Sequence, residues 1–174
     1  MDATRSRRTH DPARQRWYAF WRTVRFARFC HTPFVESRVD VAVSAGQETE
    51  HVERRRRVLL VDDSPEFLES AAHFLNTDPH IEIVGRAHSG RGALEKVPLL
   101  KPDLVLMDLS MPEMNGLDAT RAIKAHADGP RVIILTLHDN PEYRAAAADV
   151  RADGFVTKTE LDLQLLPLIH ELFA

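Results

Sequence analysis

From residue 58 onward, short runs of apolar residues alternate with longer segments in which apolar residues recur at helical spacing. The apolar runs are short and rich in Val, Ile and Leu, which favours β-strands. Runs that are apolar at nearly every position are typical of strands covered on both faces of a parallel sheet. The pattern therefore predicts five strands: VLLVD (58–62), IEIVG (81–85), DLVLMD (103–108), RVIILT (131–136) and GFVTK (154–158).

The segments between and after the strands are predicted to be helices. In the first of them, one helical face collects the apolar residues Phe67, Leu68, Ala71, Ala72 and Leu75. Ser64 and Asn140, each followed by Pro and then Glu, are typical residues for a helix start. Thr159, with Asp162 three residues later, approximates a capping box for the last helix. The predicted order is βαβαβαβαβα, an α/β fold with helices on both faces of the sheet.

Polar residues follow four of the five apolar runs. Asp62 and Asp63 end the first run, Asp108 the third, Thr136 the fourth and Lys158 the fifth. Taken singly, each has an ordinary structural explanation, such as capping a helix or lying in solvent. In an open parallel sheet, however, the carboxyl ends of the strands meet where ligands bind. We therefore expect three carboxylates, a hydroxyl and an ammonium to form one site.

The residue types at this edge point to phosphate chemistry. Three crowded carboxylates raise one another's pKa or require a cation. Mg²⁺ prefers oxygen ligands and binds through one or two carboxylates together with phosphate oxygens. Asp108 is then suited to act as a nucleophile that forms an aspartyl-phosphate. Lys158 and Thr136 would contact the oxygens of the transferred group.

The motifs VDD (61–63), MDLSMPEMNG (107–116), LT (135–136) and VTK (156–158) resemble those of the receiver domain of two-component response regulators. The resemblance covers residues 58–174. It implies a doubly wound, flavodoxin-like and CheY-like (βα)5 fold with strand order 2-1-3-4-5. It also divides the chain into a receiver domain, 58–174, and an N-terminal extension, 1–57.

The resemblance assigns a role to each acidic residue of the site. Asp108 becomes the phosphoacceptor, and Asp63 a direct ligand of Mg²⁺. Asp62 would hold the ion mainly through water, and the backbone carbonyl of Ser110 would complete the protein ligands. In the loop after Asp108, we expect Pro112 to fix one φ angle and Gly116 to adopt a conformation closed to other residues.

Other positions are assigned by the same resemblance to the response to phosphorylation. Thr136 and Lys158 form the pair that senses the phosphoryl group, and Phe155 is the aromatic residue that changes rotamer with it. Two positions depart from the usual pattern. Thr159 replaces the Pro that commonly follows the Lys, so the shape of that loop is in question. Leu137 is bulkier than usual and would restrict access to the phosphoryl group.

The resemblance implies a sensor histidine kinase or a histidine phosphotransfer protein as the phosphodonor, a downstream protein target, and a homodimer as a further option. We expect the domain to modify itself rather than to act as an enzyme. LTLHD (135–139) resembles receivers joined to LuxR-type DNA-binding domains. Only two residues follow Leu172, so we expect a stand-alone receiver with no DNA-binding output domain.

Two alternatives remain open. An aspartate-nucleophile phosphohydrolase shares this sheet, although such enzymes usually carry a second Asp where Ser110 stands. A phosphorylation-independent interaction module is the other alternative, although the complete acidic set argues against it.

Charge separates the two parts of the chain. Residues 1–57 contain 13 Arg and 7 acidic residues, whereas 58–174 contain 10 basic and 19 acidic residues. The basic extension contains no Lys and includes the aromatic segment 13–30. It is expected either to be disordered or weakly helical, or to result from a mis-called start upstream of Val52. A lone Cys30 and the lack of an apolar run near ~18 residues predict a cytoplasmic location.

Overall fold

The computed structural model describes residues 54–174, so our predictions for the extension lie outside the described residues except at its last four positions. The strands are β1 (Arg56–Val61), β2 (Ile81–Ala87), β3 (Leu104–Asp108), β4 (Arg131–Thr136) and β5 (Gly154–Thr157). The helices are α2 (Pro65–Leu75), α3 (Gly90–Leu100), α4 (Gly116–Lys124), α5 (Pro141–Asp149) and α6 (Leu161–Leu172), with a 3₁₀ helix, η1 (Lys158–Glu160).

The five strands form one parallel sheet with the order β2-β1-β3-β4-β5, which confirms the predicted fold class. From β1 the chain adds β2 on one side of the sheet and then β3, β4 and β5 on the other. In such sheets ligands bind where this order changes sides, which here is between the carboxyl ends of β1 and β3. Every residue of β3 is buried. The predicted site therefore lies at the carboxyl ends of inner strands rather than beside an outer strand.

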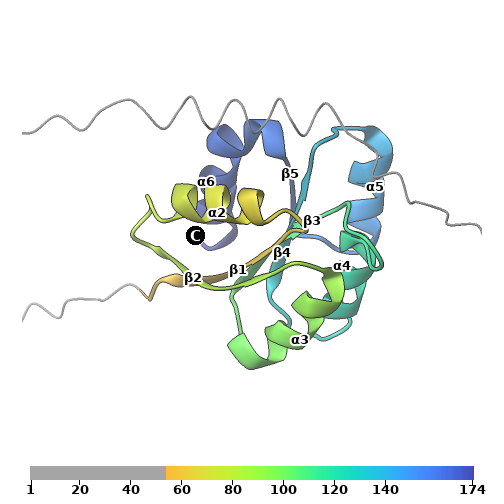
Figure 1. The fold of residues 1–174 in the computed structure, drawn as a ribbon, viewed down its shortest axis with the longest axis horizontal. Coiled ribbons are helices and arrows are strands. Elements are labelled where there is room, and N and C mark those ends of the chain that lie inside the picture. The colour runs from red at the N-terminus through yellow and green to blue at the C-terminus, as the bar shows by residue number, and fades with distance from the viewer. Residues whose placement is uncertain (1–53) are drawn as a thin grey trace, which may run out of the picture. The chain divides into compact units, whose positions relative to one another are not determined.

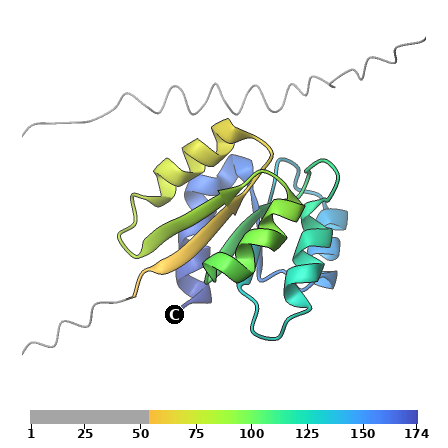
Figure 2. The ribbon, with the colours of Figure 1, turned by 60° about the horizontal axis from the view of Figure 1, so that its bottom comes forward.

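Helices cover both faces of the sheet, with α2 and α6 on one face and α3, α4 and α5 on the other (Figures 1 and 2). Because side chains alternate along a strand, each central strand contributes to both layers. The layer under α3, α4 and α5 is a continuous core built from Leu59, Val61, Val105, Met107, Val132 and Ile134 with Ala93, Ala119, Ile123 and Ala147. The α2 and α6 layer buries the apolar residues Phe67, Leu68, Ala71, Ala72, Leu75, Leu161, Leu165 and Ile169.

Side-chain caps confirm two predicted helix starts. The Ser64 hydroxyl accepts a hydrogen bond from the Phe67 backbone N–H at 3.2 Å, and the Asn140 side chain accepts one from Tyr143 at 2.7 Å. The predicted cap at Thr159 is wrong. Lys158 to Glu160 form the 3₁₀ helix η1, and α6 begins only at Leu161 without a side-chain cap.

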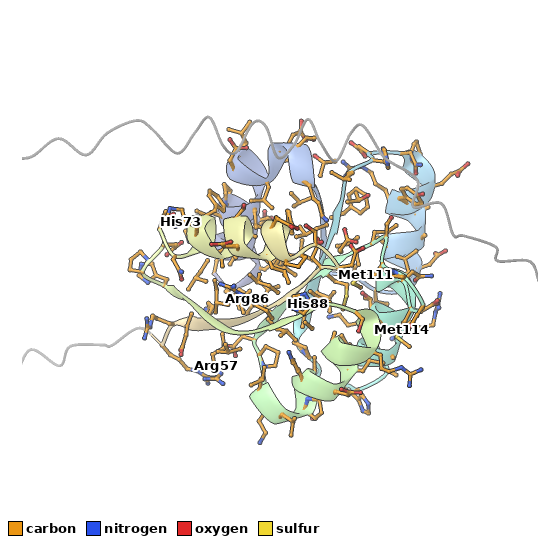
Figure 3. All side chains as sticks on the ribbon, viewed as in Figure 1. Arg57, His73, Arg86, His88, Met111 and Met114 are labelled. Carbon is orange, nitrogen blue, oxygen red and sulfur yellow. The ribbon has the colours of Figure 1, made fainter. Side chains whose placement is uncertain are left out.

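The arginines at the start of β1 cap the carboxyl ends of two helices. The guanidinium of Arg57, which is labelled in Figure 3, donates to the carbonyl of Leu100, the last residue of α3, and the two atoms lie 2.7 Å apart. Arg56 donates to the carbonyl of Phe173 after α6 at 3.2 Å, and its guanidinium lies 4.9 Å from the centre of the Phe173 ring. Cations are favourable at helix carboxyl ends, where carbonyl groups lack partners. These two arginines therefore belong to the folded domain.

Among the described residues, no helix combines the length and the apolar character that crossing a bilayer requires.

Candidate functional site

The three acidic residues predicted from the strand ends lie together. β1 pairs with β3, with Val61 opposite Met107, so the residues that follow, Asp62 and Asp108, emerge side by side. One carboxylate oxygen each of Asp62, Asp63 and Asp108 lies within 4.8 Å of the others. Asp62 and Asp108 are buried, whereas Asp63 is partly exposed. The site is thus an acidic cluster with one side open.

Lys158 brings a buried positive charge to this cluster. It follows β5, which is separated from β3 by β4, so its long side chain reaches past the end of β4. Its Nζ forms an ion pair with Asp62 and another with Oδ1 of Asp108, the latter at 2.6 Å. Only 4% of the residue is exposed. One ammonium therefore links the two buried carboxylates.

Backbone N–H groups hold the other oxygen of each buried carboxylate. The N–H of Ser64 donates to Oδ1 of Asp62 at 2.9 Å, and the N–H of Ser110 donates to Oδ2 of Asp108 at 3.0 Å. In both cases the donor lies two residues after the Asp, an arrangement that Asp commonly makes in turns. These bonds fix the rotation of both carboxylates toward Lys158.

The buried charged groups shift one another's pKa. Burial raises the pKa of Asp62 to about 6, a change that the Lys158 charge opposes and the Asp108 charge reinforces. Burial alone would lower the pKa of Lys158, but the carboxylates of Asp108 and Asp62 more than offset this and raise it. Lys158 is therefore charged at neutral pH. Three carboxylates facing one ammonium leave an excess of negative charge.

Two further predicted residues, Thr136 and Phe155, lie near the cluster in the sheet without belonging to it. Thr136 ends β4 and is buried, and its hydroxyl exchanges hydrogen bonds with the backbone of His138, donating to the carbonyl at 3.3 Å and accepting from the N–H at 3.2 Å. Phe155 on β5 is partly buried and packs against the core under α3, α4 and α5. Arg144 of α5 lies over its ring, with Cζ 4.7 Å from the centre.

The loop from Asp108 to Gly116 requires glycine for a different reason from the one predicted. No glycine among the described residues has a positive φ, so Gly116 does not supply a special conformation. A Cβ at Gly116 would instead lie 2.1 Å from the carbonyl oxygen of Asp108. The N–H of Gly116 also donates to the carbonyl of Leu109 at 2.9 Å, which closes the loop. The positive φ in this loop occurs at Glu113.

Sequence reasoning missed the aromatic neighbour of the lysine. The Nζ of Lys158 lies 4.2 Å from the centre of the Phe67 ring, from the first turn of α2. This contact stabilises the ammonium where water is excluded. The only sequence signal was the position of Phe67 just after the acidic pair, which periodicity assigned to the core.

The cluster fits a hard divalent cation. All three candidate ligands are carboxylate oxygens, which Mg²⁺ prefers, and one oxygen of each residue lies within 4.8 Å of the others. The partly exposed Asp63 leaves room for water and phosphate oxygens on the open side. The residues present are therefore a suitable donor set for Mg²⁺.

Comparison with known families agrees with the family resemblance of the sequence motifs. A family model described as the response regulator receiver domain matches residues 58–170. Among solved structures, the signal receiver domain of the response regulator NarL from Mycobacterium tuberculosis is 31% identical, with a TM-score of 0.60, over 66% of this chain and 95% of that one. The response regulator domain of CheB from Thermotoga maritima is 30% identical, with a TM-score of 0.63, over 68% and 96%.

Curated relatives are longer proteins that share this segment. A protein-glutamate methylesterase/protein-glutamine glutaminase of Nocardioides sp. is 48% identical over 98 residues, which is 56% of this chain and 26% of the relative. The response regulator protein VraR of Staphylococcus saprophyticus is 40% identical over 105 residues, which is 59% of this chain and 49% of the relative. The match thus spans half or less of the length of these relatives.

Proposed function

Because this chain belongs to the family of response regulator receiver domains, we propose that it works as a phosphorylation switch in which Asp108 accepts a phosphoryl group. The observation that carries the proposal is the contact of Lys158 with Asp108 and Asp62, inside a cluster of three carboxylates. This arrangement supports the proposal because it brings three carboxylates and one ammonium together at the carboxyl ends of the strands.

The proposed reaction transfers one phosphoryl group from a histidine side chain of the donor to the Asp108 carboxylate. An oxygen of the Asp108 carboxylate attacks the phosphorus atom of a phosphohistidine on the donor protein. A P–O bond forms while the P–N bond to the imidazole breaks, and the bonding electrons leave with the histidine nitrogen. The product is a mixed carboxylic–phosphoric anhydride on Asp108.

Several groups of this chain suit that reaction. Lys158 is charged and lies 2.6 Å from an oxygen of Asp108, so it would remain beside the transferred group and offset its negative charge. The N–H of Ser110 holds the second oxygen and orients the nucleophile. The Thr136 hydroxyl, at the end of the adjacent strand, would donate to a phosphoryl oxygen after turning away from His138.

Mg²⁺ would be held by the carboxylates of Asp62, Asp63 and Asp108, with the backbone carbonyl of Ser110 as a further ligand. When bound, the ion supplies positive charge that offsets the repulsion between the nucleophile and the phosphoryl oxygens. We take the partly exposed Asp63 as the direct ligand, whereas Asp62, which pairs with Lys158 and accepts from the N–H of Ser64, would hold the ion mainly through water.

The partners follow from this function. A sensor histidine kinase or a histidine phosphotransfer protein would supply the phosphoryl group, and Phe155 would report its presence to a downstream protein or a second copy of the chain. Such exchange takes place in the cytoplasm. We propose that the receiver domain modifies itself without enzymatic turnover. The names of its relatives describe longer proteins, including methylesterases, of which the match covers only part.

Incubation with Mg²⁺ and acetyl phosphate, followed by intact mass spectrometry, tests the proposal. The wild type should gain the mass of one phosphoryl group, and Asp108→Asn should gain none. An equal gain in Asp108→Asn would refute the assignment. Steady release of inorganic phosphate from a small phosphate ester, with no stable phosphoprotein, would instead favour the phosphohydrolase alternative.

A further inference from the structure

Arg144 connects the loop after β4 to the aromatic residue on β5. Its guanidinium lies over the Phe155 ring, with Cζ 4.7 Å from the centre. Its Nε and Nη2 donate to the two carboxylate oxygens of Asp139 at 2.6 and 2.8 Å. Such a two-point bond fixes the plane of a guanidinium, which a lysine could not do. Asp139 therefore decides where the guanidinium sits on the ring.

Asp139 is also close to the phosphate site along the chain. The preceding residue, His138, holds the hydroxyl of Thr136 through both of its backbone groups. A continuous series of contacts thus runs from Thr136 through the loop to Arg144 and the Phe155 ring. The two ends of the series are the hydroxyl expected to contact a phosphoryl group and the side chain expected to respond to it.

We propose that Asp139 and Arg144 form a latch that positions Phe155 in the unphosphorylated domain. The proposal rests on the function proposed above. A hydroxyl carries a single hydrogen, so Thr136 can donate it to His138 or to a phosphoryl oxygen, but not to both. When Thr136 turns toward the phosphoryl group, the loop loses that bond, Asp139 moves, and Arg144 no longer holds the ring.

The latch needs only a small energy to be effective. The side chains of Asp139 and Arg144 are about half exposed, at 48% and 49%, so the pair adds little to global stability. A switch between two arrangements of similar energy nevertheless responds to small differences. We expect loss of the latch to change the ratio of the two Phe155 positions by about three- to tenfold.

The test follows Phe155 directly by ¹⁹F NMR of the full chain labelled with 4-fluorophenylalanine, with its resonance assigned by Phe155→Leu. Asp139→Asn and Arg144→Lys remove the two-point bond. The matched control is Arg121→Lys, which alters another exposed Arg–Asp pair, at 2.7 Å from Asp118 on α4. Beryllofluoride with Mg²⁺ mimics the phosphoryl group and defines the switched position of the resonance.

Without any phosphoryl mimic, the Phe155 resonance of Asp139→Asn and Arg144→Lys should move part of the way toward the switched position, while the control stays at the wild-type position. Linkage requires that both variants also bind beryllofluoride about three- to tenfold more tightly. A purely structural role would not change that affinity. Variants with the wild-type resonance, or with unchanged affinity, overturn the latch. The wild type separates the two proposals: a wild-type Phe155 resonance that does not respond to beryllofluoride counts against the proposed function, whereas a wild-type response with unchanged variants overturns the latch alone.

Discussion

The Nζ atom of Lys158 lies 2.6 Å from Oδ1 of Asp108, although Asp108 ends β3 and Lys158 follows β5, two strands that are not neighbours in the sheet. The same ammonium also pairs with Asp62 and rests against the ring of Phe67. One buried cation thus joins β1, β3, β5 and α2 at the edge where the chemistry is expected. Stability and function are therefore coupled at this residue.

Replacing Lys158 should affect both properties. Lys158→Met leaves Asp62 and Asp108 buried without their cation, which we expect to lower the free energy of unfolding by about 3 kcal/mol near neutral pH. The loss should shrink near pH 5, because Asp62, whose pKa is raised by burial, takes up a proton. Urea denaturation at both pH values checks this, with the exposed Lys101→Met as the control. A loss that does not depend on pH would contradict the role of the two carboxylates.

The raised pKa of Asp62, about 6, predicts the direction of a pH effect. A carboxyl with a higher pKa in the folded than in the unfolded chain contributes stability below its unfolded pKa, and this contribution is lost as the pH rises through the folded pKa. Without Mg²⁺, the wild type should therefore lose about 2 kcal/mol of stability relative to Asp62→Asn between about pH 4 and about pH 6.5. If the free energies of unfolding of the two proteins changed equally with pH, the raised pKa of Asp62 would be refuted.

The close approach at Gly116 predicts a strict size limit. In Gly116→Ala the added Cβ would meet the Asp108 carbonyl oxygen at 2.1 Å, so the loop must shift, at a cost of about 3 kcal/mol or more. Gly92→Ala on α3 is the matched control, because its nearest neighbour would be the Ser89 hydroxyl at 3.3 Å. Thermal unfolding should separate the two. Equal melting temperatures would show that the loop adapts freely.

Replacing Asp63 should weaken Mg²⁺ binding strongly but should change the stability of the metal-free protein little. Asp63 is partly exposed, so Asp63→Asn should unfold much like the wild type in EDTA. Mg²⁺ should raise the melting temperature of the wild type, because a ligand that binds only the folded state stabilises it, and it should raise that of Asp63→Asn far less. Asp128→Asn, an exposed acid in another loop, serves as the control. An equal Mg²⁺ response in all three proteins would exclude this cluster as the metal site.

Much of the fold and the site followed from the pattern of apolar runs. The parallel sheet was predictable because buried strands leave continuous apolar runs, and the acidic cluster was predictable because Asp62, Asp63 and Asp108 each stand directly after such a run. The strand order itself came from the family resemblance. The approach of Lys158 to the acidic residues was predictable because the carboxyl ends of parallel strands lie at the same end of the sheet.

What the sequence did not reveal depends on how separate segments approach one another. The start of α6 was predicted one residue too early, because Lys158 to Glu160 first form the 3₁₀ helix η1. The reason for Gly116 is a contact with a backbone atom of Asp108, which a conformational rule for glycine does not detect. The link from Asp139 through Arg144 to Phe155 depends on contacts between separate segments, and the sequence analysis singled out only Phe155 of the three.

Chemical identification of the modified residue tests the central claim most directly. Borohydride reduces an aspartyl-phosphate to homoserine, so treatment of the protein after incubation with Mg²⁺ and acetyl phosphate marks the phosphoacceptor permanently. Peptide sequencing by mass spectrometry should then find homoserine at position 108 and aspartate at positions 62 and 63. Homoserine at either of those positions instead, or aspartate retained at 108 in protein that has gained a phosphoryl group, would contradict the account.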